Sequence, residues 1–223
     1  MLKKGAYRAF RNLPVGWVLQ AIHSTDSSER NFRFIVELSL LLICTNIIIQ
    51  IKLFDSVFTT ILFSFFITHT INWFITGNFW VYILDSFIIM KNQGVNSIIS
   101  YIKLTKRILL LGNFCDSILI YGSMCRSQLH IRSDLDLRIV RRTDSKKGYL
   151  CLPLAFFLRA YSFFIMMPVD LQVVDSAEFL GKQMRSDEKP IVVYCRNGVV
   201  IKNAGKSFLD IERKPETVLK DKQ

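Results

Sequence analysis

The stretch of sequence that most restricts the fold runs from residue 118 to residue 140 and reads ILIYGSMCRSQLHIRSDLDLRIV. The apolar residues 117–121 have the length and composition of a short strand. Gly122 and Ser123 follow in a predicted tight turn, where the missing glycine side chain lets a phosphate approach the backbone amides. A helix after this turn would point its N-terminus at the same anion. The pattern therefore predicts a phosphate-binding turn.

Two carboxylates come about a dozen residues after this turn. Asp134 and Asp136 flank Leu135 at a second predicted strand, 135–140. The strand period of two puts both carboxylates on one face, while Leu135 and Leu137 pack on the other. Carboxylates about 7 Å apart at Cα can jointly hold a pair of metal ions. Oxygen ligands suit Mg²⁺, so the sequence predicts a magnesium site, with Mn²⁺ as an alternative ion.

These residues resemble the DNA polymerase beta-like nucleotidyltransferase superfamily, in its small bacterial and archaeal type. The signature of that family is an apolar strand, Gly-Ser, a spacer, and then Asp-apolar-Asp. Residues 122–123 and 134–136 match it in type, order and spacing, and the resemblance covers roughly residues 95–195. Small members usually have Arg-Gly after the Gly-Ser, whereas this chain has Arg126-Ser127. The resemblance implies an α+β nucleotidyltransferase fold, with a small mixed sheet flanked by helices.

A third carboxylate on a neighbouring strand is also implied by the resemblance. Asp170 fits, because it lies in a predicted strand at 169–174. Its competitor, Asp175, has the opposite strand parity. Asp175 also begins the sequence Asp-Ser-Ala-Glu, which is typical of a capping box at the start of a helix. We therefore expect Asp170 to be the third carboxylate and Asp175 to cap a helix.

The reaction implied by the resemblance is in-line attack of an acceptor hydroxyl on the α-phosphorus of a nucleoside triphosphate such as ATP, with release of pyrophosphate. In it the metal-binding and catalytic residues are Asp134, Asp136 and Asp170. The nucleotide-binding residues are Gly122, Ser123 and Arg126. Four more basic residues could assist, but we expect them to be solvated surface residues: Arg132, Arg138, Lys182 and Arg185. His130 is likewise expected to lie in a surface loop.

The composition of the 223-residue chain is both apolar and basic. Lys and Arg number 29 against 18 Asp and Glu, for a net charge of +11, yet 51% of residues are hydrophobic. Apolar and basic residues must therefore be segregated. The 18 Phe exclude a disordered chain. The five Cys are odd in number and form no CxxC pair, which disfavours a disulfide scaffold or zinc ribbon and favours a reducing compartment.

The first third of the chain predicts a transmembrane hairpin. No charged residue lies between Asp55 and Asp85, and the run 57–76 has the length that spans a hydrocarbon core. A second run, 34–51, is similar but contains Glu37. The alternative is a buried hairpin in a soluble helical domain, but so short a chain has little else to cover two such helices. We expect a membrane-associated region at 1–92 and a nucleotidyltransferase domain at 93–223.

Basic residues on both sides of the hairpin predict its orientation. The positive-inside rule puts both termini and the catalytic domain in the cytoplasm, at the plasma membrane of a prokaryote. No cleavable signal peptide is expected. Residues 1–20 have the composition of a segment that lies on an anionic leaflet or of a solvated basic tail. Residues 79–90 are expected to form an interfacial or re-entrant helix. One helix face is shared by His69, Asn72 and Trp73. They are either interhelical hydrogen-bonding residues or a functional group.

Several functions fit these patterns. The first is a membrane-anchored nucleotidyltransferase whose acceptor is a lipid, a lipid-linked glycan intermediate or a polar headgroup. A second is an enzyme that nucleotidylates a partner protein, as antitoxin-like relatives do. The third is a membrane scaffold or sensor that binds the triphosphate without turnover. No specific nucleic acid is expected as a partner, because many basic residues are explained by their positions beside the membrane segments and no stacking-aromatic motif accompanies the rest.

Overall fold

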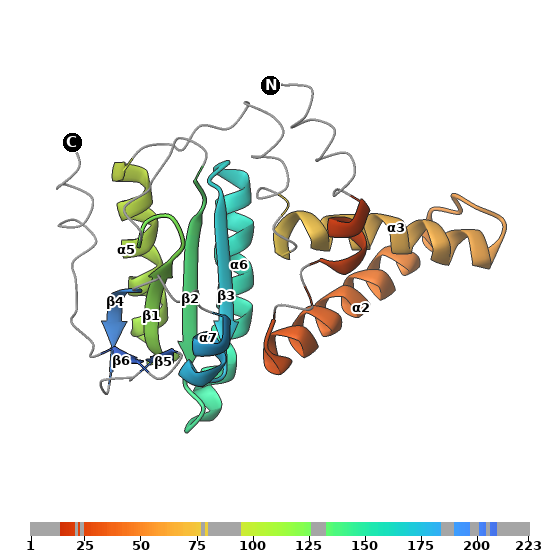
Figure 1. Ribbon diagram of the computed structural model, residues 1–223. Coiled ribbons are helices and arrows are strands. Elements are labelled where there is room, and N and C mark those ends of the chain that lie inside the picture. The colour runs from red at the N-terminus through yellow and green to blue at the C-terminus, as the bar shows by residue number, and fades with distance from the viewer. Residues whose placement is uncertain are drawn as a thin grey trace.

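The computed structural model describes residues 14–20, 22, 25–76, 79, 95–125, 133–183, 190–196, 201–203 and 206–208. These residues form a helical hairpin joined to a small mixed sheet with helices (Figure 1), so the expected α+β arrangement is confirmed at this level. The predicted boundary at 92/93, residues 1–13 and nearly all of 79–90 lie outside the described residues. The elements are α2 (Ser27–Gln50), α3 (Val57–Thr76), α5 (Val95–Leu111), β1 (Cys115–Tyr121), β2 (Leu135–Arg141), η2 (Lys146–Leu150), α6 (Cys151–Phe164), β3 (Val169–Val174), α7 (Ala177–Gln183), β4 (Ile191–Cys195), β5 (Ile201–Asn203) and β6 (Lys206–Phe208).

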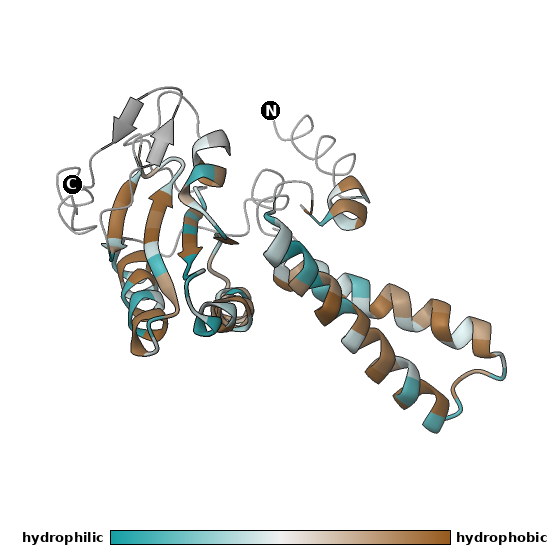
Figure 2. Ribbon diagram, turned by 90° about the horizontal axis from the view of Figure 1, so that it is seen from below, coloured by the Kyte–Doolittle hydropathy of each residue, from teal (hydrophilic) through white to brown (hydrophobic). Residues whose placement is uncertain are grey.

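The hairpin consists of α2 and α3, and both helices are long and apolar enough to cross a membrane. Helix α3 coincides with the predicted run 57–76. Helix α2 starts at Ser27, earlier than predicted, because Asp26 caps it by accepting a hydrogen bond from the Ser27 amide at 2.6 Å. Large apolar side chains remain exposed along the hairpin, with Phe34 exposed by 68% and Phe58 by 74%. Figure 2 shows that hydrophobic residues, in brown, predominate along both helices.

A stripe of small and polar residues on α3 is buried within the hairpin. Its members recur every four residues, at Thr60, Ser64, Thr68, Asn72 and Thr76. Each of the four hydroxyls donates to the carbonyl four residues earlier, at 2.8–3.1 Å. These hydroxyls are satisfied within their own helix, and their small side chains allow α2 and α3 to approach closely.

Polar side chains join the two helices to the short helical segment at residues 14–19. Glu37 of α2 lies 2.5 Å from His69 of α3. Asn72 donates to Glu37 at 3.2 Å and to Gln20 at 3.0 Å. The interpretation of His69 and Asn72 as interhelical hydrogen-bonding residues is therefore confirmed. Trp73 packs edge-on against Phe79, with ring centroids 4.9 Å apart.

The four-stranded sheet has the order β3-β2-β1-β4, with β2 and β3 parallel and the other pairs antiparallel. The predicted strands are confirmed, each within two residues of its expected ends. Helices α5 and α6 cover one face, on which Ile118, Leu137 and Leu171 form the core. Helix α7 packs on the other face, against Val140 and Val174. All five Cys are free, as the sequence indicates.

The first turn of α2 docks on the outer edge of β3, which ends the sheet. The Val173 amide donates to Glu29 at 2.5 Å, and the Asp175 amide donates to Asp26 at 2.9 Å. Arg159 of α6 donates both to a β3 carbonyl, at 2.8 Å, and to Glu29. Polar groups that an edge strand normally exposes are thus bonded by side chains of the hairpin and of α6.

Asp175 does not cap α7, so that prediction is wrong. Its carboxylate accepts from Arg141 at 2.5 Å and from Ser28 of α2 at 2.7 Å. Ser176 takes the capping role, because its hydroxyl accepts from the Phe179 amide at 3.3 Å. The long-range ion pair to Arg141 competes successfully with the local capping pattern.

Candidate active site

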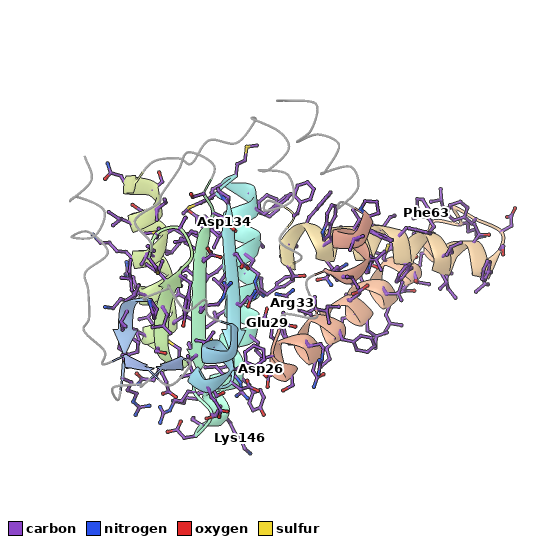
Figure 3. All side chains as sticks on the ribbon, in the orientation of Figure 1. Asp26, Glu29, Arg33, Phe63, Asp134 and Lys146 are labelled. Atoms are coloured by element: carbon purple, nitrogen blue, oxygen red, sulfur yellow. The ribbon has the colours of Figure 1, made fainter. Side chains whose placement is uncertain are left out.

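The three predicted catalytic carboxylates are brought together at the end of the sheet where β2 and β3 begin. Asp134, which is labelled in Figure 3, directly precedes β2. Asp136 lies opposite Asp170 in the parallel register of β2 and β3, so both side chains face the same side. Leu135 and Leu137 face α5 and α6 in the core, as predicted. The carboxylates therefore lie on the face of the sheet away from these two helices.

The predicted glycine turn lies directly beside this carboxylate group. Tyr121, the last residue of β1, is opposite Asp136, and Gly122 follows with φ +72. A Cβ at Gly122 would lie 1.8 Å from Asp136 Oδ2. Only glycine allows this backbone to approach the carboxylate so closely. The predicted helix after the turn lies outside the described residues.

Ser123 contributes a polar atom at the same turn. Its hydroxyl oxygen is buried and has no hydrogen-bond partner among the residues that the structure describes. Buried hydroxyls are usually satisfied, so this oxygen is available to an oxygen-rich ligand such as a phosphate. Arg126, the third predicted nucleotide-binding residue, lies outside the described residues.

Asp136 is the carboxylate most affected by its surroundings. Burial, followed by the negative charges of Asp134 and Asp170, raises its pKa to about 8, against the opposing effect of Arg138. A raised carboxyl pKa is what crowding of like charges in a desolvated site produces. A bound cation would reverse this effect, because it stabilises the ionised form.

Arg138 is a site residue that the sequence analysis misassigned to the solvated surface. Its guanidinium donates to the Asp170 carboxylate at 2.8 Å and to the Asp170 carbonyl at 2.9 Å. It also lies 3.6 Å from Asp136 Oδ1. The strand period contained the signal, because Arg138 shares the parity of Asp136 and hence its face of the sheet.

The donor chemistry of this group fits a divalent cation. Three carboxylates beside a phosphate-sized glycine turn supply the oxygen ligands that Mg²⁺ prefers. However, the described residues contain no group of three His, Cys, Asp or Glu side chains already arranged to hold a metal. The Arg138 guanidinium bonds Asp170 Oδ2 at 2.8 Å, so a bound cation would compete with it for the same negative charge.

The side chains of the remaining residues considered from the sequence lie outside the described part of the chain. His130, Arg132 and Arg185 lie outside the described residues, as does the side chain of Lys182. Comparison of the chain with models of known protein families, with curated proteins and with solved structures finds no match.

Proposed function

We propose that this protein is a membrane-anchored nucleotidyltransferase of the DNA polymerase beta-like type. The observation that supports the proposal most is the grouping of Asp134, Asp136 and Asp170 beside the Gly122 turn. Two of these carboxylates lie on adjacent parallel strands, and the third directly precedes one of them. A glycine that allows close backbone approach and a buried hydroxyl at Ser123 lie next to them. This is a donor set for two cations and a triphosphate.

In the proposed reaction the oxygen of an acceptor hydroxyl forms a bond to the α-phosphorus, and the bond from that phosphorus to pyrophosphate breaks. Asp134 and Asp136 would hold both Mg²⁺ ions, and Asp170 would hold the ion on the acceptor side. When bound, such ions would lower the pKa of the acceptor hydroxyl and neutralise phosphate charge. Ser123 and the turn amides orient the phosphates. The acceptor proton leaves to solvent, and Arg138 neutralises the carboxylates until the ions bind.

The hairpin provides the anchor in this proposal. Its exposed apolar surface favours a transmembrane arrangement over a buried soluble one. The flanking basic residues favour cytoplasmic termini, so the carboxylates would face the cytoplasmic pool of triphosphates. An anchored enzyme meets a membrane-borne acceptor at high local concentration, which favours a lipid or a lipid-linked glycan intermediate as acceptor.

Label transfer tests this proposal. Membranes with the full-length chain are incubated with each α-³²P nucleoside triphosphate and Mg²⁺, and the lipid and protein fractions are counted. We expect label with the wild type and none with Asp170→Asn. Asp144→Asn is the matched control, because this carboxylate is exposed in the loop after β2 and forms an ion pair with Arg142, away from the three carboxylates. Equal labelling by wild type and the double variant Asp134→Ala/Asp136→Ala would contradict the proposal.

A nucleotide sensor is the second candidate, and the Arg138–Asp170 ion pair favours it. This pair neutralises the Asp170 carboxylate with a side chain of the protein itself, as a site that binds without turnover could do. A sensor would bind a triphosphate in a carboxylate-dependent manner and transfer no label to any fraction.

A further inference from the structure

Helix α6 has an unusual distribution of apolar residues for a helix on a sheet. Its polar residues Arg159 and Ser162 are buried, whereas Phe157 is 67% exposed and Phe164 is 78% exposed. Tyr161 lies between these two and is 47% exposed. The helix thus has an apolar outer face as well as an apolar inner one.

These exposed residues form one continuous face. Leu150, Phe157, Tyr161 and Phe164 are separated by seven, four and three residues, spacings that keep them on the same side of a helix. The face runs the whole length of α6 and is too large to be an isolated exposed side chain. Its 14 residues extend about 21 Å, which is shorter than a hydrocarbon core of about 30 Å. The length of α6 fits a helix that lies along a partner surface better than a helix that crosses a bilayer.

The neighbouring charges identify the partner's chemistry. Lys146 and Lys147 are exposed at the start of α6, and Lys103 and Arg107 are exposed on α5, which covers the same face of the sheet. The helices α5, η2 and α6 contain no Asp or Glu. The candidate active-site carboxylates lie on the opposite face. The face formed by α5 and α6 therefore combines a purely basic charge with an apolar strip, which is the composition of surfaces that bind anionic bilayers.

Helix α6 also packs against the hairpin. Phe163 stacks on Phe74 of α3, with ring centroids 5.8 Å apart, and Phe156 packs edge-on against Phe32 of α2 at 6.4 Å. Figure 1 shows α6 on the side of the sheet from which the hairpin projects. A membrane that receives the hairpin would therefore lie close to α6.

We infer that α6 lies on the surface of an anionic bilayer, with its apolar outer face in the lipid and the basic residues of α5 and η2 at the headgroups. The catalytic domain would then contact the membrane directly and not only through its anchor. This inference goes beyond the proposed activity and rests on the proposed anchoring by the hairpin. Phe side chains are typical of the apolar face of helices that lie in a membrane interface.

Site-specific photo-crosslinking of the full-length chain in vesicles of phosphatidylglycerol and phosphatidylcholine tests the inference. A benzophenone amino acid replaces Phe157 or Phe164, both mostly exposed, so the fold is little disturbed. Phe58 near the hairpin loop is the control for anchoring. Glu178, exposed on α7 on the opposite face of the sheet, is the control for nonspecific labelling. We expect lipid adducts from Phe58, Phe157 and Phe164, several-fold above those from Glu178.

Each other outcome has a distinct meaning. Lipid adducts from Phe58 alone would overturn the inference and leave the anchoring intact. The absence of adducts from Phe58 would instead contradict the anchoring itself. Crosslinks from Phe157 to a second copy of the chain, or to another part of the same chain, would overturn the inference by showing what covers α6. Equal labelling of Phe164 in vesicles of phosphatidylcholine alone would overturn the assignment of anionic lipid.

Discussion

Gly122 is the residue whose substitution should be most informative about the candidate active site. Its φ of +72 costs any other L-residue about 1–2 kcal/mol, and an added Cβ would meet Asp136 Oδ2. Gly122→Ala should therefore lower the free energy of unfolding by at least that amount and displace the carboxylate. Chemical denaturation in detergent and triphosphate binding measure the two effects. Ser123→Ala is the control for stability in the same turn: an equal loss in the free energy of unfolding would contradict this account.

The raised pKa of Asp136 predicts a specific dependence of stability on pH. Its folded pKa of about 8 lies above the ordinary value of 3.8, so between these values the folded state binds more protons than the unfolded state. Stability must then fall as pH rises through this window. Asp136→Asn lacks this loss, so its melting temperature should exceed that of the wild type at pH 8 and match it near pH 4.

The pH experiment is done in the presence of a chelator, so that no cation stabilises the ionised carboxylate. Asp144→Asn provides the control, because Arg142 lowers the Asp144 pKa and the sign of its contribution is opposite. A melting temperature of Asp136→Asn that stays at or below the wild-type value at pH 8 would show that the carboxylates are not crowded.

At the scale of elements, the docking of α2 on β3 depends on Glu29. This carboxylate is fully buried, and it bonds Arg33, Arg159 and the Val173 amide. Glu29→Gln would leave two buried guanidinium groups without their charge partner, which typically costs about 3–5 kcal/mol. The measurement is thermal or chemical unfolding. Arg30→Gln, one residue further and exposed, should change stability by less than about 0.5 kcal/mol, and similar effects of both variants would contradict the docking role of Glu29.

Local patterns in the sequence predicted the elements well, and long-range pairs account for what was missed. The charge-free run at α3 and the alternation around Asp136 are periodic signals within one element. Glu29 and Arg159 lie on different elements far apart in the chain, and no periodicity connects them. Asp175 had a good local explanation as a cap, yet Arg141 on another strand binds it. The strand period places Arg138 on the face of Asp136, but its ion pair with Asp170 on the neighbouring strand has no local signal.

At the scale of the whole molecule, the hairpin and the sheet are connected by more than the chain. The hairpin contacts β3 through its first turn and α6 through aromatic rings. Figure 3 shows Glu29 and Arg33 at this junction, with Phe63 far out on the hairpin. The sequence predicted both parts but not their junction, because buried polar contacts between parts follow from the three-dimensional arrangement alone.

The arrangement of the two sheet faces also determines how far a membrane-borne acceptor would have to extend from the bilayer. The carboxylates lie on one face and α5 and α6 on the other. If α6 rests on the bilayer, a layer of helix about 10 Å thick and the sheet itself separate the three carboxylates from the lipid surface. A soluble triphosphate crosses no such barrier. A membrane-borne acceptor, in contrast, has to extend its hydroxyl around the edge of the domain, so a long, flexible headgroup meets this requirement and a compact one does not.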